Sequence, residues 1–256
     1  MNPRPGRSRV FLLSPAFSGG KRAQMLLSER AQFELARKLR AGEAALGELF
    51  AFMSGLYFRG KLAYARAFAA PPPGLEVEGA VLVITAGEGL VRADAPVALE
   101  RLRAFEAVRV DARDPAYRRP LARDARALSK RLGDGEAVLL GSIATGKYLD
   151  PLLETLGPRL VFPKDFVGRG DMSRGGLMLR CVDEGRELEY VPVTGAVRHG
   201  VRPPKLPPRE RKAQAEAGGD PLRFSARGAG GQPLGPDRAR DAPCSPSRLN
   251  RTRARG

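Results

Sequence analysis

An α/β fold is the class that the sequence predicts, in the form of a three-layer, Rossmann-like domain whose sheet is parallel or mixed. Short apolar runs alternate with helix-forming segments from Arg9 to about Phe162, an order typical of a sheet covered by helices. Apolar residues make up 43% of the 256-residue chain, close to the usual value for globular proteins. After about His199 the chain is rich in Pro, Arg, Gly and Ala and loses apolar periodicity, so a disordered basic tail is expected. The predicted boundaries are a disordered segment at 1–8, a single domain at 9–197 and the tail at 198–256.

Short apolar runs rich in β-branched residues predict the strands. The clearest is AVLVIT at 80–85, whose continuous apolar character suits a central parallel strand. A C-terminal β-hairpin is expected from 177–182 and 187–191, closed by Asp183-Glu184-Gly185. The other predicted strands lie at 9–13, 107–110, 137–140 and 160–162.

Residues 23–69 are rich in Ala, Leu, Glu, Lys and Arg, which predicts two or three helices broken near Gly42 and near Ser54-Gly55. In the last of them Tyr57, Tyr64 and Phe68 recur at helical spacing, and three prolines at 71–73 end it. Further helices are predicted at 97–105, 121–132 and 149–156.

The formal net charge of +16 suggests a nucleic-acid partner, but its distribution weakens that suggestion. Residues 1–40 carry a net charge of +7 and residues 198–256 one of +9, whereas residues 41–197 are neutral overall. The single His199 excludes a site that needs two imidazoles, and two cysteines, one of them in the tail, do not form a disulfide framework or a zinc site. We therefore predict no metal site.

The expected localisation is cytoplasmic, without a membrane partner. No run approaches the roughly 18 apolar residues that span a bilayer. The apolar run at 10–13, although it follows three arginines, is too short for the core of a signal peptide.

Four loops that follow strands are unusual, and ligands of open α/β sheets bind at the carboxyl ends of strands. The loop at 14–22, SPAFSGGKR, offers Ser14, Lys21 and Arg22 at a helix start, where amides and the helix dipole favour an anion. A flexible connector with solvated charges is the alternative. The loop at 85–90, TAGEGL, has two glycines that allow a ligand to approach the backbone, but a tight turn explains them equally well.

The third loop, GSIATGK at 141–147, has the spacing of a P-loop and lies between a predicted strand and a predicted helix. Tyr148 follows where a Ser or Thr would hold magnesium, which argues against a nucleoside triphosphatase. A looser anion-binding turn would use Ser142, Thr145 and Lys147. The alternative is a turn of small residues with a surface lysine.

The fourth loop, PKDFVGRGDMSRGG at 163–176, combines four glycines with paired arginines and aspartates. Loops of this composition often bind polar ligands. Arg169 and Arg174 would hold a phosphate or carboxylate, and Asp171 would act as the catalytic acid or base or bind a ribose hydroxyl. The alternative is a mobile loop in which the arginines pair with the aspartates.

Four residues at a predicted helix start are candidates for the same edge of the sheet: Ser54, Tyr57, Arg59 and Lys61. Their alternative is a structural one, with Tyr57 in the core and the cations on a solvated face. His199 is interpreted as a linker residue.

The order of three motifs resembles a known group of domains. SPAFSGGKR follows the first strand, LYFRGKLAYA forms a Tyr-containing helix, and a later strand ends in VITAGEGLV. Residues 9–110 are similar in this order to Rossmann-like bacterial and archaeal domains of unknown function. Some of these accompany archaeosine-type tRNA-modifying enzymes and are distantly related in fold to uracil-DNA glycosylases. The resemblance implies ligand-facing residues at Ser14, Lys21 and the turn 87–90, and a nucleobase, nucleotide or nucleic acid as ligand. It does not imply glycosidic cleavage, because the usual glycosylase catalytic residues are not recognisable.

The leading hypothesis is a domain that binds or processes a nucleotide, nucleobase or other phosphorylated or nucleoside-like ligand at these loops. Whether it is an enzyme stays open, and the cofactor is unknown. Two alternatives are a non-enzymatic nucleic-acid-binding protein that uses its basic termini and a scaffold without a ligand. In the leading hypothesis Asp171 is the acid or base, and the anion is held by Lys21, Arg22, Lys147, Arg169 and Arg174.

Overall fold

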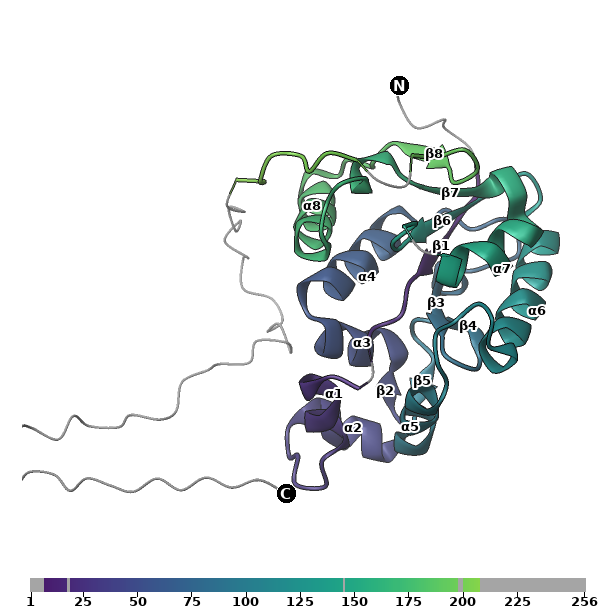
Figure 1. Ribbon diagram of the computed structural model, residues 1–256. Coiled ribbons are helices and arrows are strands. Elements are labelled where there is room, and N and C mark those ends of the chain that lie inside the picture. Colours follow the sequence, from purple (N-terminus) through teal and green to yellow (C-terminus); the bar gives the residue numbers. More distant parts are fainter. Residues whose placement is uncertain (1–6, 18, 145, 198–199, 208–256) are drawn as a thin grey trace, which may run out of the picture. The chain divides into compact units, whose positions relative to one another are not determined.

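A six-stranded mixed sheet forms the centre of the computed structural model (Figure 1). The structure describes residues 7–17, 19–144, 146–197 and 200–207, all within one compact unit, Met1–Ala215. The strand order is β4-β3-β1-β6-β7-β8. Four inner strands run parallel, and the two edge strands are antiparallel to their neighbours. The strands are β1 (Arg9–Leu13), β3 (Val81–Thr85), β4 (Gly89–Arg92), β6 (Glu136–Leu140), β7 (Leu160–Pro163) and β8 (Tyr190–Pro192). The α/β class is confirmed.

The direction in which the chain adds strands reverses at β1. From β1 the chain crosses to β3 on one side, and it later returns to place β6 on the other side. Leu13 pairs with Leu140, so β1 and β6 end in register, and the Ser14 N–H donates to the Leu140 carbonyl at 3.2 Å. The carboxyl ends of these two strands therefore form the topological switch point of the sheet.

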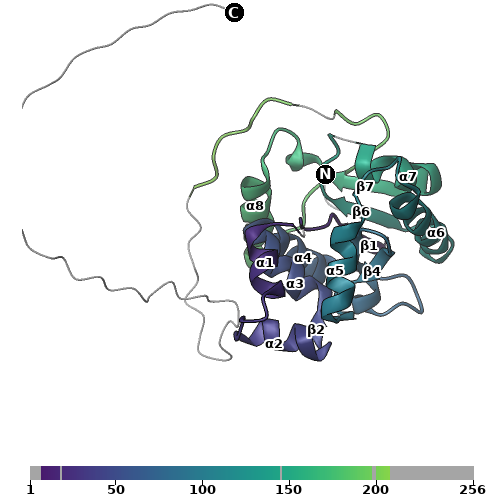
Figure 2. The ribbon, with the colours of Figure 1, turned by 60° about the horizontal axis from the view of Figure 1, so that its bottom comes forward.

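Helices cover both faces of the sheet (Figures 1 and 2). On one face α4 (Leu56–Phe68) packs against α8 (Asp171–Glu184), and on the other α6 (Pro115–Leu132) packs against α7 (Gly146–Leu156). The helix α6 begins as its sequence dictates, because Asp114 caps it by accepting the Ala116 N–H at 2.9 Å and Pro115 follows. Its buried residues recur at helical spacing: Tyr117, Leu121, Ala125, Leu128 and Leu132.

The N-terminal half adds four smaller helices and a second, two-stranded sheet. Between residues 21 and 68 the chain forms four helices, the last of which is α4, where two or three were expected at 23–69. The predicted breaks at Gly42 and Gly55 are confirmed. Gly42 ends a helix at a φ of +74°, a conformation that favours glycine. These elements are α1 (Lys21–Leu27), α2 (Glu34–Ala41), β2 (Ala44–Ala45), α3 (Leu46–Ser54), β5 (Pro96–Val97) and α5 (Leu99–Ala107). Three 3₁₀ turns complete the described elements: η1 (Val77–Ala80), η2 (Gly157–Arg159) and η3 (Lys164–Phe166).

The predicted C-terminal β-hairpin at 177–191 is wrong. Residues 177–182, which were expected to be its first strand, belong to the helix α8. The strand β8 therefore has no partner there and pairs with β7. Gly175, Met178 and Cys181 are buried at a spacing of three, which places one face of a helix against the core. This packing decides the structure of a segment whose local composition suits a strand equally well.

One smaller prediction also fails, and one open alternative is resolved. The strand expected at 107–110 is absent, because α5 runs to Ala107 and the residues after it form no strand. The loop at 85–90 is the tight turn of the open alternative: it joins β3 to β4, which pair from Thr85↔Gly89 onward. Gly89 has a φ of +82°, and a Cβ there would lie 2.3 Å from the Asp124 carboxylate. Packing on α6 therefore explains this glycine.

The disordered segments predicted at 1–8 and 198–256 lie mostly outside the described residues. Residues 200–207 are described and form neither helix nor strand. There the Arg180 guanidinium of α8 donates to the Pro207 carbonyl, so the contacts with the fold continue past the predicted boundary at 197. No helix in the described part of the chain has the length and apolar character to cross a membrane.

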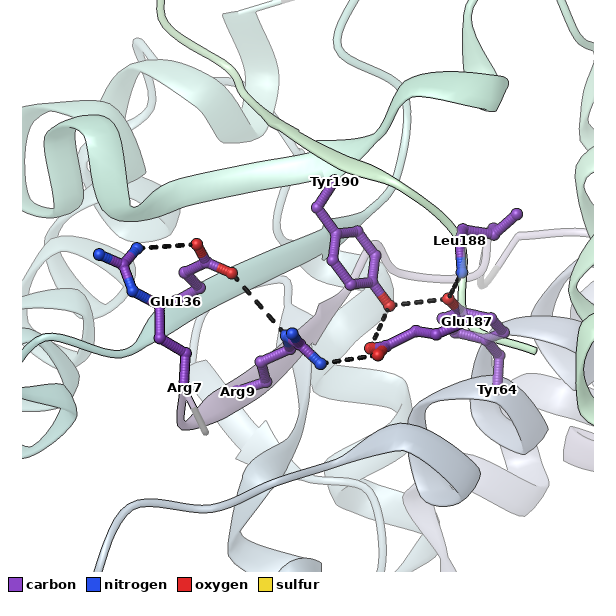
Figure 3. Close-up of polar contacts among 7 residues, drawn as sticks. All are labelled: Arg7, Arg9, Tyr64, Glu136, Glu187, Leu188 and Tyr190. Carbon is purple, nitrogen blue, oxygen red and sulfur yellow. Dashed lines mark hydrogen bonds and ion pairs between the residues drawn. The ribbon is translucent and has the colours of Figure 1, made fainter. Parts of the chain in front are cut away.

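A polar network ties the amino ends of the strands to α4 and to the segment before β8 (Figure 3). The Leu188 N–H donates to the Tyr64 hydroxyl at 2.8 Å, and the two hydroxyls of Tyr64 and Tyr190 lie 2.7 Å apart. The Tyr190 hydroxyl donates to Glu187 at 2.8 Å, and Glu187 forms an ion pair with Arg9 at 2.7 Å. Burial raises the pKa of both tyrosines, so both stay neutral.

Candidate functional site

The candidate site lies at the switch point, where the chain leaves β1 at Ser14 and β6 at Gly141. A Cβ added to Gly141 would lie 2.9 Å from the Ser14 Cβ and 3.2 Å from its Oγ. Only glycine leaves room for the Ser14 hydroxyl at this point. The predicted meeting of the loops after 13 and after 140 is therefore present in the structure.

Lys61 of α4 reaches the end of β1 from one face of the sheet. Its Nζ donates to the Ser14 carbonyl oxygen at 2.6 Å and lies 3.0 Å from the Ser14 Oγ. The rings of Tyr57 and Phe58 flank it, with centroids 4.5 and 4.6 Å from Nζ. The side chain is enclosed, since Lys61 keeps 1% of its surface exposed and Ser14 keeps 5%. The solvated-face interpretation of Lys61 is therefore wrong.

Opposing effects set the protonation state of Lys61. Burial, together with the nearby Arg174, lowers its pKa to about 7 against the opposing effect of Asp171. The two aromatic rings also favour the charged form. Small changes in this environment would therefore shift Lys61 between amine and ammonium near neutral pH.

Two glycines bring α8 close enough to α4 to place these charges beside Lys61. A Cβ on Gly60 would lie 2.7 Å from the Gly175 carbonyl oxygen, and one on Gly175 would lie 2.8 Å from the Leu56 carbonyl oxygen. The backbones of the two helices are thus in direct contact. Figure 2 shows the two helices side by side on one face of the sheet.

Tyr57 contributes a buried hydroxyl that has no hydrogen-bond partner of acceptable geometry among the described residues. Burial raises its pKa to about 12, against the opposing effect of Arg174, so the hydroxyl keeps its proton. Tyr148, in the first turn of α7, also has its pKa raised by burial and by Asp171. A buried hydroxyl without a partner costs on the order of 1–3 kcal/mol, and a ligand that supplied one would recover that cost.

Arg174 and Asp171 stand in the first turn of α8, not in the mobile loop that the sequence suggested. The Arg174 guanidinium donates twice to the Phe166 carbonyl, at 3.0 and 3.1 Å, and rests on the Phe166 ring. Its Nη1 lies 3.6 Å from the Asp171 carboxylate. The Arg174 side chain is 13% exposed and that of Asp171 67% exposed, so the arginine is held in place while the aspartate faces solvent.

Some of the other predicted site residues bind neighbouring backbone atoms, and the remaining ones are exposed or lie outside the described residues. Arg22 donates to the Phe52 carbonyl in the last turn of α3 at 3.2 Å, and Arg169 donates to the Asp165 carbonyl four residues earlier at 3.0 Å, so each binds a backbone carbonyl. The Ser142 hydroxyl accepts the Ala144 N–H at 3.3 Å in the loop after β6. Lys21 and Lys147 are exposed at the starts of α1 and α7, and Thr145 lies outside the described residues.

Comparison with protein-family models, curated proteins and solved structures gives no match. The resemblance of residues 9–110 to Rossmann-like domains therefore stays a prediction. Within the described part of the chain, no three His, Cys, Asp or Glu side chains are grouped so as to hold a metal ion.

Lys61 is the residue whose importance the sequence understated. The signal was its position, four residues after Tyr57 and three before Tyr64, on the apolar face of an amphipathic helix. A lysine on such a face lies either at its solvated border or in the interior with a hydrogen-bond partner. The spacing alone does not distinguish these two positions.

Replacing Lys61 by methionine is expected to change how stability depends on pH. The unfolded chain keeps the lysine proton up to about pH 10.4, whereas the folded protein releases it near pH 7. Between these values the unfolded state binds more protons, so the free energy of unfolding of the parent rises with pH relative to Lys61→Met, by about 1.4 kcal/mol per pH unit at most.

Urea unfolding of both proteins at pH 6, 7, 8 and 9 would measure this difference. Below pH 7 the difference is expected to be flat, because both states are protonated. The exposed Lys130 provides the control, since Lys130→Met is expected to leave the pH dependence of the parent unchanged. Parallel curves for the parent and Lys61→Met would show that Lys61 has an ordinary pKa.

Proposed function

We propose that the chain binds a small anionic ligand, a nucleotide or another phosphorylated or nucleoside-like molecule, at the carboxyl ends of β1 and β6. The observation that supports this most is the reversal of strand order at β1. Open α/β sheets bind their ligands in the crevice that such a reversal creates, because the loops leave the two neighbouring strands in opposite directions.

The charges and polar atoms at this point suit an anion. Arg174 is the cationic group of this cluster, and its guanidinium is held by two hydrogen bonds to the Phe166 carbonyl. Its position is fixed before a ligand arrives, which reduces the entropy cost of binding. The Tyr57 hydroxyl is available to donate to a phosphate or ribose oxygen.

The sequence also favours a nucleoside-like ligand over a simple phosphate. The domains that residues 9–110 resemble include some linked to tRNA-base modification. The loops after β1 and β6 contain small residues, Gly19, Gly20 and Gly141 among them, that allow a planar or bulky group close to the backbone.

A thermal-shift panel tests the proposal on the full chain. The probes are nucleoside mono- and diphosphates, a free nucleoside, a sugar phosphate and inorganic phosphate. A ligand present at 100 times its Kd stabilises the folded state by about 2.7 kcal/mol. For a domain of this size that corresponds to a rise in Tm of roughly 5–10 °C. We expect such a rise with at least one nucleotide and a smaller one with the free nucleoside.

Arg174→Met is expected to reduce the ligand-induced rise in Tm, measured against the Tm of the variant itself. Arg186→Met is the matched control, because Arg186 is exposed just beyond the other end of α8 and pairs with Glu184. No stabilisation by any probe, or equal stabilisation of Arg174→Met and the parent, would overturn the proposal.

A further inference from the structure

We infer that Ser14 is a nucleophile and Lys61 its general base, so that the site cleaves an acyl ester or amide of the bound ligand. The inference rests on the proposed function for the location of the ligand. It goes beyond it by assigning a reaction and two catalytic residues.

The geometry of the Ser14–Lys61 contact suits proton transfer. The amine donates one hydrogen to the Ser14 carbonyl at 2.6 Å and has the Ser14 hydroxyl at 3.0 Å. A neutral amine has two hydrogens and one lone pair. With one hydrogen committed to the carbonyl, the lone pair can point to the hydroxyl and accept its proton.

The burial of Lys61 favours the neutral amine that a base requires. A buried ammonium is costly unless a carboxylate compensates it, and among the described residues no carboxylate lies within 4.0 Å of Nζ. The groups that face it are the Tyr57 and Phe58 rings on its own helix, and Asp171 and Arg174 on α8, of which Asp171 has the larger electrostatic effect. The resulting pKa of about 7 gives an appreciable amine fraction at neutral pH.

The position of Ser14 suits a nucleophile. It is the residue directly after β1, at the switch point, and its side chain packs where a Cβ on residue 141 would lie. The serine keeps more of its surface exposed than the lysine does. The proposal therefore places the ligand on the side of the serine, with the amine behind it.

The reaction proceeds in two steps that together consume one water molecule. Lys61 takes the Ser14 hydroxyl proton as Oγ bonds to the acyl carbon, and the ammonium returns that proton to the alcohol or amine that leaves. Water then attacks the acyl carbon of the Ser14 ester while Lys61 takes a proton from it. The ammonium gives that proton to the Ser14 Oγ as the acyl–oxygen bond breaks, and the carboxylic acid and the free serine hydroxyl result.

Labelling of the full chain with a fluorophosphonate tests the inference. Ser14 Oγ would attack phosphorus and displace fluoride while Lys61 takes the proton, leaving a stable adduct that peptide mass spectrometry locates. We expect the parent to form an adduct on Ser14 at a rate that rises from pH 6 to pH 8, as Lys61 loses its proton. Ser14→Ala is expected to form none, and Lys61→Arg to react at least about 100-fold more slowly, since arginine does not act as a base.

Ser28→Ala is the control, because it removes an exposed hydroxyl at the end of α1 that has no place in the proposed site, and it should leave labelling unchanged. Circular dichroism of each variant confirms that it is folded, and Ser14→Ala retains the lysine–carbonyl hydrogen bond. No adduct on Ser14 of the parent, or equal rates for Lys61→Arg and the parent, would overturn the inference.

The two experiments test the ligand and the catalytic pair independently. Stabilisation by a nucleotide without an adduct on Ser14 would refute the nucleophile and leave the ligand. An adduct on Ser14 without stabilisation by any anionic probe would keep the catalytic pair and refute the anionic ligand.

Discussion

Replacing Gly175 by alanine is expected to destabilise the protein by about 3 kcal/mol. The new methyl group would lie 2.8 Å from the Leu56 carbonyl oxygen and 2.9 Å from the Tyr57 Cα. Both are backbone atoms of α4, so no side-chain rotation relieves the contact and one helix must move. Urea unfolding at neutral pH would measure the loss of stability.

The neighbouring Gly176 provides a matched control on the same helix. A Cβ at Gly176 meets nothing within 4 Å, and alanine favours a helix interior over glycine by roughly 0.5–1 kcal/mol. Gly176→Ala is therefore expected to be neutral or stabilising. Equal effects of the two substitutions would show that the backbones of α4 and α8 are not in direct contact.

Gly175→Ala should also disturb the candidate site. Arg174 is the adjacent residue, and the electrostatic effect of Arg174 and Asp171 on Lys61 depends on how near α8 lies to α4. Any reduction in Ser14 labelling by this substitution, measured where the variant is still folded, would link the helix contact to the reactivity of the site.

The four parallel strands and most helices were predictable because local pattern and tertiary structure agree. The apolar run at 80–85 is an inner strand, and the glycines at 42 and 55 end helices. The helix α8 was not predictable in this way. Its segment GRGDMSRGG is typical of a loop. The contacts that require glycine at 175 come from residues of α4 that lie 115 or more positions earlier in the chain.

The location of the candidate site could be predicted better than its chemistry. That the loops at Ser14 and Gly141 meet follows from the rule that parallel strands end at one edge. That Lys61 joins Ser14 does not follow, because the partners are 47 residues apart and their contact depends on how α4 crosses the sheet. Arg22 and Arg169 were candidates as cations in glycine-rich loops after strands, yet Arg22 donates to a carbonyl of α3 and Arg169 to a carbonyl four residues earlier.

Replacing Glu187 by alanine is expected to cost about 3–5 kcal/mol, because it removes one partner of a buried ion pair. The Glu187 side chain is only 11% exposed and Arg9 lies 2.7 Å away, so the arginine would lose its near partner in a place that water hardly reaches. Glu136, at 3.8 Å from the Arg9 Nε, moderates the loss but is not close enough to replace the pair. Chemical denaturation of Glu187→Ala measures the effect.

The control for this prediction is Glu189→Ala, two residues along the chain. Glu189 is 44% exposed and pairs with the exposed Lys164 at 3.4 Å, and exposed pairs contribute about 0–1 kcal/mol. A cost for Glu187→Ala no greater than that for Glu189→Ala would show that the Arg9 ion pair contributes little.

The hydroxyl chain in Figure 3 gives this prediction a second part, because Glu187 also accepts the Tyr190 hydroxyl at 2.8 Å. In Glu187→Ala the Tyr190 hydroxyl loses its acceptor, and in Tyr190→Phe the Tyr64 hydroxyl loses its neighbour at 2.7 Å. Residues that share one hydrogen-bond network show coupling energies of about 0.5–3 kcal/mol. The double variant is therefore expected to be less destabilised than the two single costs combined, since the second substitution removes a group that the first has already left unpaired. Strict additivity in a double-mutant cycle would mean that the ion pair and the hydroxyl chain stabilise the amino end of the sheet independently.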